Sequence, residues 1–231
     1  MKLRHSIAAL SILAIASLSA CGPDISVGSK EGKALNEEQT IPVDTSATGK
    51  LVLANSNGNI TVIGEADRDE IQMVPTLNSD DPEAGTIAVY VEGDAAYVAV
   101  TAGDDADVDI TIHTPANLTF DVTTGGGALD LSGMSGGGTA TTGNGNASLD
   151  LGEVNSDLTV TTASGNISLG IPGDTAAGLT ATANGGSLDI DSSFGVSDEY
   201  GTGVATGDIN GGGSFDITLT TAGGDISVSS N

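Results

Sequence analysis

The sequence lacks tryptophan, contains a single cysteine, and has three phenylalanines and three tyrosines. Its core must therefore be built from aliphatic side chains, alanine and threonine. Lysine and arginine are also scarce. Neither occurs after Arg68, while 31 acidic residues give the chain a formal net charge of −25. A negative field of this size repels other polyanions, so we expect no nucleic-acid partner.

Side chains suited to nucleophilic or zinc chemistry are also few. His113 is the only histidine after residue 20, and alternation along its segment places it on a polar strand face beside Asp109 and Thr111. One histidine without a second cysteine cannot build a typical zinc site. No serine lies in a nucleophile-elbow setting. We therefore expect a protein that is not an enzyme and has no resident cofactor.

The chain begins with a targeting segment at residues 1–20. Lys2 and Arg4 precede an apolar stretch shorter than the roughly 20 residues that a transmembrane helix needs. The stretch ends in Leu18-Ser19-Ala20-Cys21, which resembles the lipobox of bacterial lipoproteins. The resemblance implies that Cys21 becomes the lipid-modified first residue of the mature protein. The alternative is an ordinary secretory signal that leaves Cys21 as a free thiol.

The residues after Cys21 bear on where the protein is held. Gly22 follows the cysteine, where an acidic residue would mark inner-membrane retention in Gram-negative sorting, so the sequence favours the outer membrane. Residues 21–39 mix Gly, Ser, Lys and Glu without apolar periodicity, and we expect a lipid-anchored flexible tether. Membrane contact must come from acyl chains, because so acidic a chain cannot bind anionic lipid. The sequence thus predicts an exported envelope protein, with an unknown envelope or surface partner.

Residues 40–122 alternate between apolar and polar side chains with the period of a β-strand. Strands are predicted on both sides of Asn57-Gly58-Asn59 and of Gly93-Asp94, and residues 77–85 read as an exposed loop. In residues 107–112 the apolar side chains fall on one face and the polar ones on the other. No window shows a helical stripe. The class is all-β, and this region is predicted to be antiparallel.

Residues 123–231 repeat one pattern, as in "TTGNGNASLDL", "TTASGNISLG" and "TTAGGDISV". A spacing of about 20 residues indicates a β-solenoid, either a parallel β-helix or a roll, in which each coil stacks on the previous one. Leu149 and Leu151 are predicted to point inward, and Ser148 and Asp150 outward. The repeated position falls at Ala128, Ala147, Ile167, Ser187, Ile209 and Ile226.

The remaining features of each repeat fit a stacked architecture. Gly165-Asn166 and its counterparts are predicted corners, where the backbone needs positive φ or leaves no room for a side chain. The threonines suit a half-exposed strand surface. The last repeat, "GGDISVSSN", has no obvious polar cap, so its open edge is expected to meet a partner or fray.

The order of segments resembles a known family. "ANSNGNITVIG" is followed by "VEGDAAYVAV", then by "ADVDITIHTPANLTFDVTT" and by the repeated coils. This arrangement resembles the bacterial putative-adhesin β-solenoid family of unknown function, over roughly residues 40 to 231. The resemblance implies a β-helix-like or roll fold and an exported, envelope-associated location. It implies no catalytic residues. We therefore expect an adhesin or surface scaffold.

Carboxylate clusters leave two alternatives open. Hard cations favour oxygen ligands, so a calcium-dependent binding module is one of them. Neighbouring coils in register would place Asp130 about 4.8 Å from Asp150. The weak metal candidates are Asp104, Asp105, Asp107, Asp130 and Asp150. The less favoured alternative is a carbohydrate hydrolase that uses Asp189 with Asp191, or the stacked Asp150.

Overall fold

The computed structural model describes residues 39–42, 49–78, 85–102, 107–196, 198–199 and 203–231. Within these residues the chain forms two β-sheets and one short 3-10 helix, η1 (Ser192–Phe194). The targeting segment, Cys21 and all but the last residue of the predicted tether lie outside the described residues, as does most of the predicted loop at 77–85. None of the described helices is long and apolar enough to cross a membrane.

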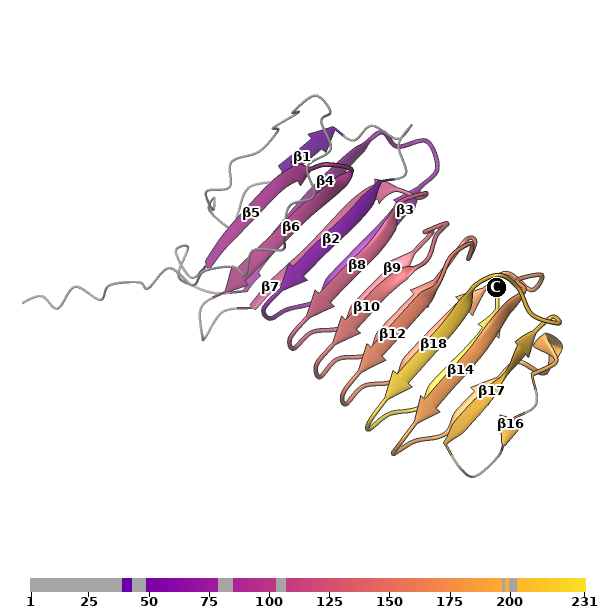
Figure 1. Ribbon diagram of the computed structural model, residues 1–231. Coiled ribbons are helices and arrows are strands. Elements are labelled where there is room, and N and C mark those ends of the chain that lie inside the picture. Colours follow the sequence, from indigo (N-terminus) through magenta and orange to yellow (C-terminus); the bar gives the residue numbers. More distant parts are fainter. Residues whose placement is uncertain (1–38, 43–48, 79–84, 103–106, 197, 200–202) are drawn as a thin grey trace, which may run out of the picture.

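Sheet A is the larger sheet and contains ten strands among the described residues. In Figure 1 its strands lie side by side, each crossing the long axis of the molecule. In spatial order they are β5 (Gly85–Glu92), β6 (Ala95–Ala102), β2 (Lys50–Asn55), β8 (Thr119–Thr124), β10 (Gly138–Thr142), β12 (Leu158–Thr162), β18 (Asp216–Thr221), β14 (Ala177–Ala183), β17 (Val204–Ile209) and β16 (Asp198–Glu199).

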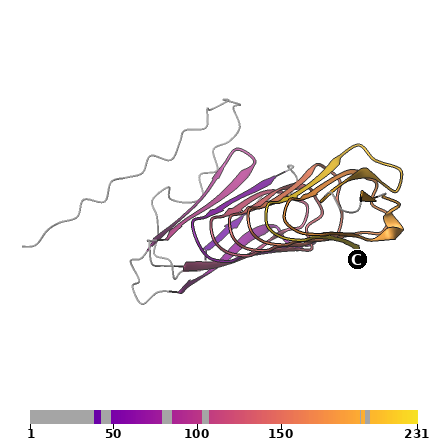
Figure 2. The ribbon, with the colours of Figure 1, turned by 90° about the horizontal axis from the view of Figure 1, so that it is seen from below.

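Sheet B contains nine strands among the described residues. In spatial order they are β1 (Gln39–Pro42), β4 (Glu70–Asn78), β7 (Asp107–Pro115), β3 (Ile60–Glu65), β9 (Leu129–Ser132), β11 (Ala147–Asp150), β13 (Ile167–Ile171), β19 (Ile226–Ser230) and β15 (Leu188–Ile190). Figure 2 shows the two sheets as opposite walls of a stack of flattened loops. Each coil contributes one strand to each sheet, which confirms the predicted all-β solenoid.

The core lies between the two sheets and consists of aliphatic side chains in register. Leu149 and Leu151 are buried while Ser148 and Asp150 are exposed, as the alternation predicts. Each inward side chain packs against its equivalents in the next coils, and full burial of a leucine or isoleucine contributes about 1.5–3 kcal/mol. One such stack in sheet B is formed by Leu131, Leu149, Leu169, Val228 and Ile190.

The repeated glycines are corners because the neighbouring coil leaves no room for a side chain. A Cβ on Gly165 would lie 1.9 Å from the Gly145 carbonyl oxygen of the adjacent coil, and a Cβ on Gly145 would lie 2.0 Å from that of Gly127. Of Gly165 and its counterparts Gly58, Gly127, Gly145, Gly186 and Gly224, only Gly58 has a positive φ, at 113°. Close approach of the backbones therefore explains most of this glycine content.

The two threonines of each pair have different roles. The first lies on the outer face, as the sequence predicted, and the second is buried. Thr161 is half-buried on the outer face, as expected, but Thr162 is only 1% exposed. Its hydroxyl donates to the Gly145 carbonyl oxygen at 3.0 Å and accepts from the Gly165 N–H at 2.9 Å. The same two bonds recur at Thr124, Thr142 and Thr221. Each buried threonine thus links the corner that follows it to the corner of the adjacent coil.

The coils do not stack in chain order, which corrects one prediction. The C-terminal coil, residues 216–231, lies between coil β12–β13 and coil β14–β15, with parallel pairing on both sides. The final strand is therefore internal, and its predicted open edge is wrong. The repeat assigned to Ile209 is also wrong, because β17 turns back and pairs antiparallel with β14 in sheet A.

The solenoid begins earlier in the chain than the repeats suggest. Strands β2 and β3 form one coil and β6 and β7 another, and the first lies between the second and coil β8–β9. Antiparallel pairing in this region is restricted to the contacts of β1, β4 and β5. The prediction of an antiparallel N-terminal region therefore holds only at its outer edge.

Candidate functional site

The predicted acidic ladder is not formed. Asp130 faces Ser148 in the adjacent coil, and Asp150 faces Ser132 on one side and Gly170 on the other. The two carboxylates are thus offset by two positions, which corrects the predicted spacing. The cause is the register between β9 and β11: the two carboxylates would face each other only if Gly127 were opposite Ala147, whereas Leu129 is opposite Ala147.

The other metal candidates are not brought together by the described structure. Asp104 and Asp105 lie outside the described residues. Asp107 is exposed and accepts a hydrogen bond from the Asn57 amide. In the described part of the chain, no group of three or more His, Cys, Asp and Glu side chains is placed to hold a metal ion.

Of the three carboxylates considered for hydrolysis, Asp189 is exposed opposite Ser227 on β19, and the other two make structural contacts. Asp191 caps η1 by accepting the Ser193 N–H at 2.9 Å, and it also accepts the Ser230 hydroxyl at 3.1 Å. These hydrogen bonds, led by the one from the Ser193 backbone, lower the pKa of Asp191 below its usual value of 3.8. Asp150 accepts a bond from the Asn231 amide at 2.7 Å. A general acid would need the opposite shift, so Asp191 is poorly suited to that role.

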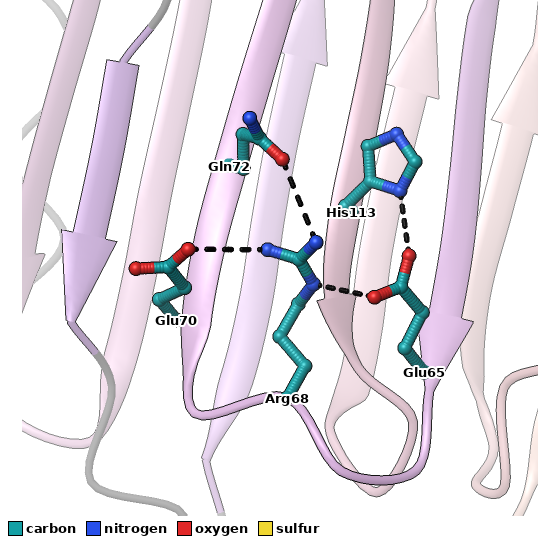
Figure 3. Close-up of polar contacts among 5 residues, drawn as sticks. All are labelled: Glu65, Arg68, Glu70, Gln72 and His113. Carbon is teal, nitrogen blue, oxygen red and sulfur yellow. Dashed lines mark hydrogen bonds and ion pairs between the residues drawn. The ribbon is translucent and has the colours of Figure 1, made fainter.

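A cluster of charged and polar side chains lies at the turn between β3 and β4 (Figure 3). Strand β7 lies between β4 and β3, which brings His113 close to both. The Arg68 guanidinium donates to Glu65 at 2.8 Å and contacts Glu70 at 3.4 Å and Gln72 at 3.5 Å. His113 Nδ1 lies 2.7 Å from the other Glu65 oxygen.

The hydrogen bonds and ion pairs within this cluster stabilise the turn between β3 and β4. Hydrogen bonding from Arg68, with a smaller contribution from His113, lowers the pKa of the Glu65 carboxyl below its usual 4.5. The Arg68 side chain is 17% exposed and that of Glu65 is 40% exposed. Residues 65–70, which include Glu65, Arg68 and Glu70 of the cluster, line a shallow depression. The groups of the cluster bond to one another and hold the turn, and His113 lies on the polar face as predicted.

The outer face of sheet A carries two rows of threonine hydroxyls. Successive coils are in register, so threonines at equivalent positions lie one strand apart, at about 4.8 Å. We call this surface the threonine face. It is formed by Thr139, Thr159, Thr218 and Thr180 in one row and by Thr141, Thr161, Thr220 and Thr182 in the other. Thr180 is exposed and the other seven are half-buried.

The same face ends in an aromatic pair that our sequence analysis missed. The Tyr90 and Tyr97 rings stack with centroids 4.9 Å apart and planes 9° from parallel. The two residues are register partners in the β5–β6 hairpin. The Gly93-Asp94 turn carries a usable signal, because a two-residue turn aligns residues 92 and 95 and hence 90 and 97. The threonine rows could not be predicted from the sequence. They depend on the register between neighbouring coils, and the repeat defines that register only to within one residue.

Taken together, the coil stacking and the two-walled core define an all-β solenoid of parallel coils with antiparallel strands at its ends. The chain belongs to the Toastrack family, DUF4097, whose family model matches residues 24–229. No protein with a curated description matches the chain significantly.

One of the solved structures that match the chain has a similar fold. A crystal structure described as a putative cell adhesion protein from Clostridium sporogenes is 13% identical, with a TM-score of 0.60, and the match covers 84% of this chain and 99% of that one. A putative adhesin from Bacteroides fragilis is 12% identical over 84% of this chain and 96% of its own, with a TM-score of 0.27. One from Parabacteroides merdae is 10% identical over 84% and 95%, with a TM-score of 0.24. Only the first of these shows a shared fold.

Proposed function

We propose that this protein is exported, anchored to the cell envelope through lipid on Cys21, and acts as a non-catalytic adhesin or surface scaffold. The threonine face is the observation that carries the adhesive role. It is a flat, regular array of hydroxyls on parallel strands, and it suits contact with an extended polar partner better than it suits a reaction. The description of the Clostridium sporogenes neighbour as a putative cell adhesion protein agrees with this role.

The negative charge of the coils disfavours anionic polymers as partners. The coils after Arg68 carry carboxylates but no lysine or arginine. An anionic polymer would be repelled from them, whereas a neutral hydroxylated surface or a cationic one would not. We therefore propose an uncharged polar or basic envelope or surface partner. Its binding should depend on salt only if the partner is basic, because screening acts on the charge contribution alone.

The anchor rests on the lipobox at residues 18–21 and on Gly22, which favours the outer membrane. Metabolic labelling with an alkyne fatty acid tests it in producing cells. The full chain should incorporate label and fractionate with membranes, and Cys21→Ser should do neither. Gly22→Ala is the matched control and should remain labelled. Label retained in Cys21→Ser would refute this anchor.

The adhesive role is tested on the threonine face itself. Replacing Thr139, Thr141, Thr159 and Thr161 together by valine removes four hydroxyls and keeps the β-branched shape that strands favour. The control changes Ser148 and Ser168 on sheet B to alanine. Material that the wild type retains from envelope extract, at two salt concentrations, should be lost by the valine variant and kept by the control. Equal retention by all three proteins would count against the threonine face.

A further inference from the structure

The C-terminal coil fills a gap between two coils that precede it in the chain. Strand β18 lies between β12 and β14, and β19 lies between β13 and β15. Figure 1 shows β18, in yellow, between the two orange strands. The coils on either side are consecutive in sequence, yet none of their strands pair with each other in the described structure. They form the two walls of a slot that one later segment occupies.

In the part of the chain that the structure describes, strand pairing links the two coils that form the slot only through the C-terminal coil, which pairs with the strand edges of both. Among the described residues, β15 pairs only with β19. Without the C-terminal coil, coil β12–β13 would present an unpaired edge in both sheets, and β15 would lose its ladder. Unpaired edges of this kind readily pair with a strand from another chain. The inward side chains of the C-terminal coil are completely or almost completely buried: Ile217, Leu219, Ile226 and Val228.

The coil enters the slot through a glycine-rich connection. Residues 210–215, "NGGGSF", join β17 to β18 and pass over the start of β14. Gly211 and Gly212 both have φ of 85°, and Asn210 has φ of 50°. A Cβ on Gly213 would lie 1.9 Å from the Ala176 carbonyl oxygen. Glycine has access to many other backbone conformations, so this connection can serve as a hinge.

The contacts that hold the end of the coil are made with both walls of the slot and with the end of β11 in the coil beyond β12–β13. The Asn231 amide donates to Asp150 at 2.7 Å and to the Leu151 carbonyl at 2.9 Å. The Asn231 N–H donates to the Ile171 carbonyl at 3.0 Å, and the Ser230 hydroxyl donates to Asp191 at 3.1 Å. A chemically identical coil from another chain would make each of these contacts unchanged.

We propose that the slot also accepts the C-terminal coil of a second copy of this chain, so that copies are joined by exchange of residues 216–231. The exchanged and unexchanged forms share every ladder, side-chain stack and terminal contact, and they differ only in the course of the hinge. Such exchange of an identical element is a low-cost route to assembly. Reciprocal exchange closes a dimer, and one-way exchange extends a chain of copies. This inference does not depend on the proposed adhesive role.

The position of the coil can be recorded with cysteines at register partners. Ser168 on β13 and Ser227 on β19 face each other, at a neighbour-strand spacing compatible with a disulfide. One tagged full-length copy carries Ser168→Cys, and a differently tagged copy carries Ser227→Cys. The two copies are produced in the same cells and then oxidised or treated with a short bismaleimide. Exchange predicts a covalent product that carries both tags.

Two controls make the outcome decisive. Ser148 and Ser168 are also register partners, but their coils follow each other in chain order, so separate copies with Ser148→Cys and Ser168→Cys should give no product above the Cys21 background. A single chain with both Ser168→Cys and Ser227→Cys should cross-link internally and report the unexchanged form. Deleting Gly211–Gly213 should raise the two-tag fraction, because a shorter hinge hinders return to the same chain. Internal cross-linking without any two-tag product, with or without the deletion, would overturn the proposal.

Discussion

The Thr162 hydroxyl donates to the Gly145 carbonyl oxygen of the neighbouring coil at 3.0 Å, and this bond links the two features that dominate the repeat. Glycine is needed at position 145 because a Cβ there would collide with the preceding corner, at Gly127, just as a Cβ on Gly165 would collide with the corner at Gly145. The close approach of the corners then places the carbonyl within reach of the threonine. The second threonine of the "TT" pair and the corner glycine therefore act together to join neighbouring coils.

Thr162→Val should reduce the free energy of unfolding by about 1–3 kcal/mol, because the half-buried Gly145 carbonyl and the buried Gly165 N–H each lose a partner. Valine keeps the shape of the side chain, so little packing is lost. Urea unfolding of the full chain measures the change. Thr161→Val, on the half-buried outer face, should change it by less than about 0.5 kcal/mol. Equal effects at the two positions would contradict the buried hydrogen-bond role.

Gly165→Ala should destabilise the protein by about 3 kcal/mol or more, the upper end for overpacked sites, because the new Cβ would meet the Gly145 backbone. The matched control is Gly173→Ala, whose Cβ would meet only the Ser230 side chain at 3.7 Å. Thermal unfolding of both variants distinguishes close approach from a general intolerance of alanine. A mild effect at position 165 would show that the coils can separate at the corner.

Asp225 should make part of the stability depend on pH. Its oxygen accepts the Ser187 N–H at 2.7 Å and the Ser187 hydroxyl at 2.9 Å, and these bonds lower its pKa below the usual 3.8. The stability gained is fully present above 3.8 and is lost as the pH falls through the lower folded-state pKa.

Asp225→Asn tests this dependence, because an amide oxygen serves the same role at Asn146, which accepts the Asn166 N–H. The urea midpoint of the variant should fall less than that of the wild type between pH 7 and about pH 3. An identical slope in the two proteins would show that other carboxylates account for the acid sensitivity.

Arg68→Gln should raise the pKa of Glu65 towards 4.5, because the guanidinium hydrogen bond is the largest influence that lowers it. His113→Ala should raise it by a smaller amount. Carboxyl carbon shifts followed by NMR through an acid titration report both values. A larger change in the histidine variant would reverse the assignment of causes in the cluster.

Calcium should stabilise the protein no more than sodium at matched ionic strength. Asp130 and Asp150 are offset in register and face serine and glycine, so they do not form the paired ligands that a hard cation prefers. Thermal unfolding with millimolar calcium, compared with ionic-strength-matched sodium, measures the difference. A larger shift with calcium would point to a site that includes residues beyond those described.

Local pattern was sufficient to predict the coils. Alternation buried Leu149 and Leu151 and exposed Ser148 and Asp150, since a strand permits only two faces. The same pattern placed His113 on a polar face. It could not assign the second threonine of each pair, because a period of two does not reveal that the Thr162 hydroxyl bonds to the Gly145 carbonyl of the adjacent coil.

The sequence by itself determined that the chain winds into coils with aliphatic interiors and glycine corners, because these properties depend on neighbours along the chain. The tertiary structure alone decided which coil stacks on which. The inward faces of the repeats are chemically alike, so any coil could pair with any other as far as local energies are concerned. Strand β17 covers the outer edge of β14 in sheet A. That edge is closed to the C-terminal coil, which consequently lies on the inner side and completes both sheets.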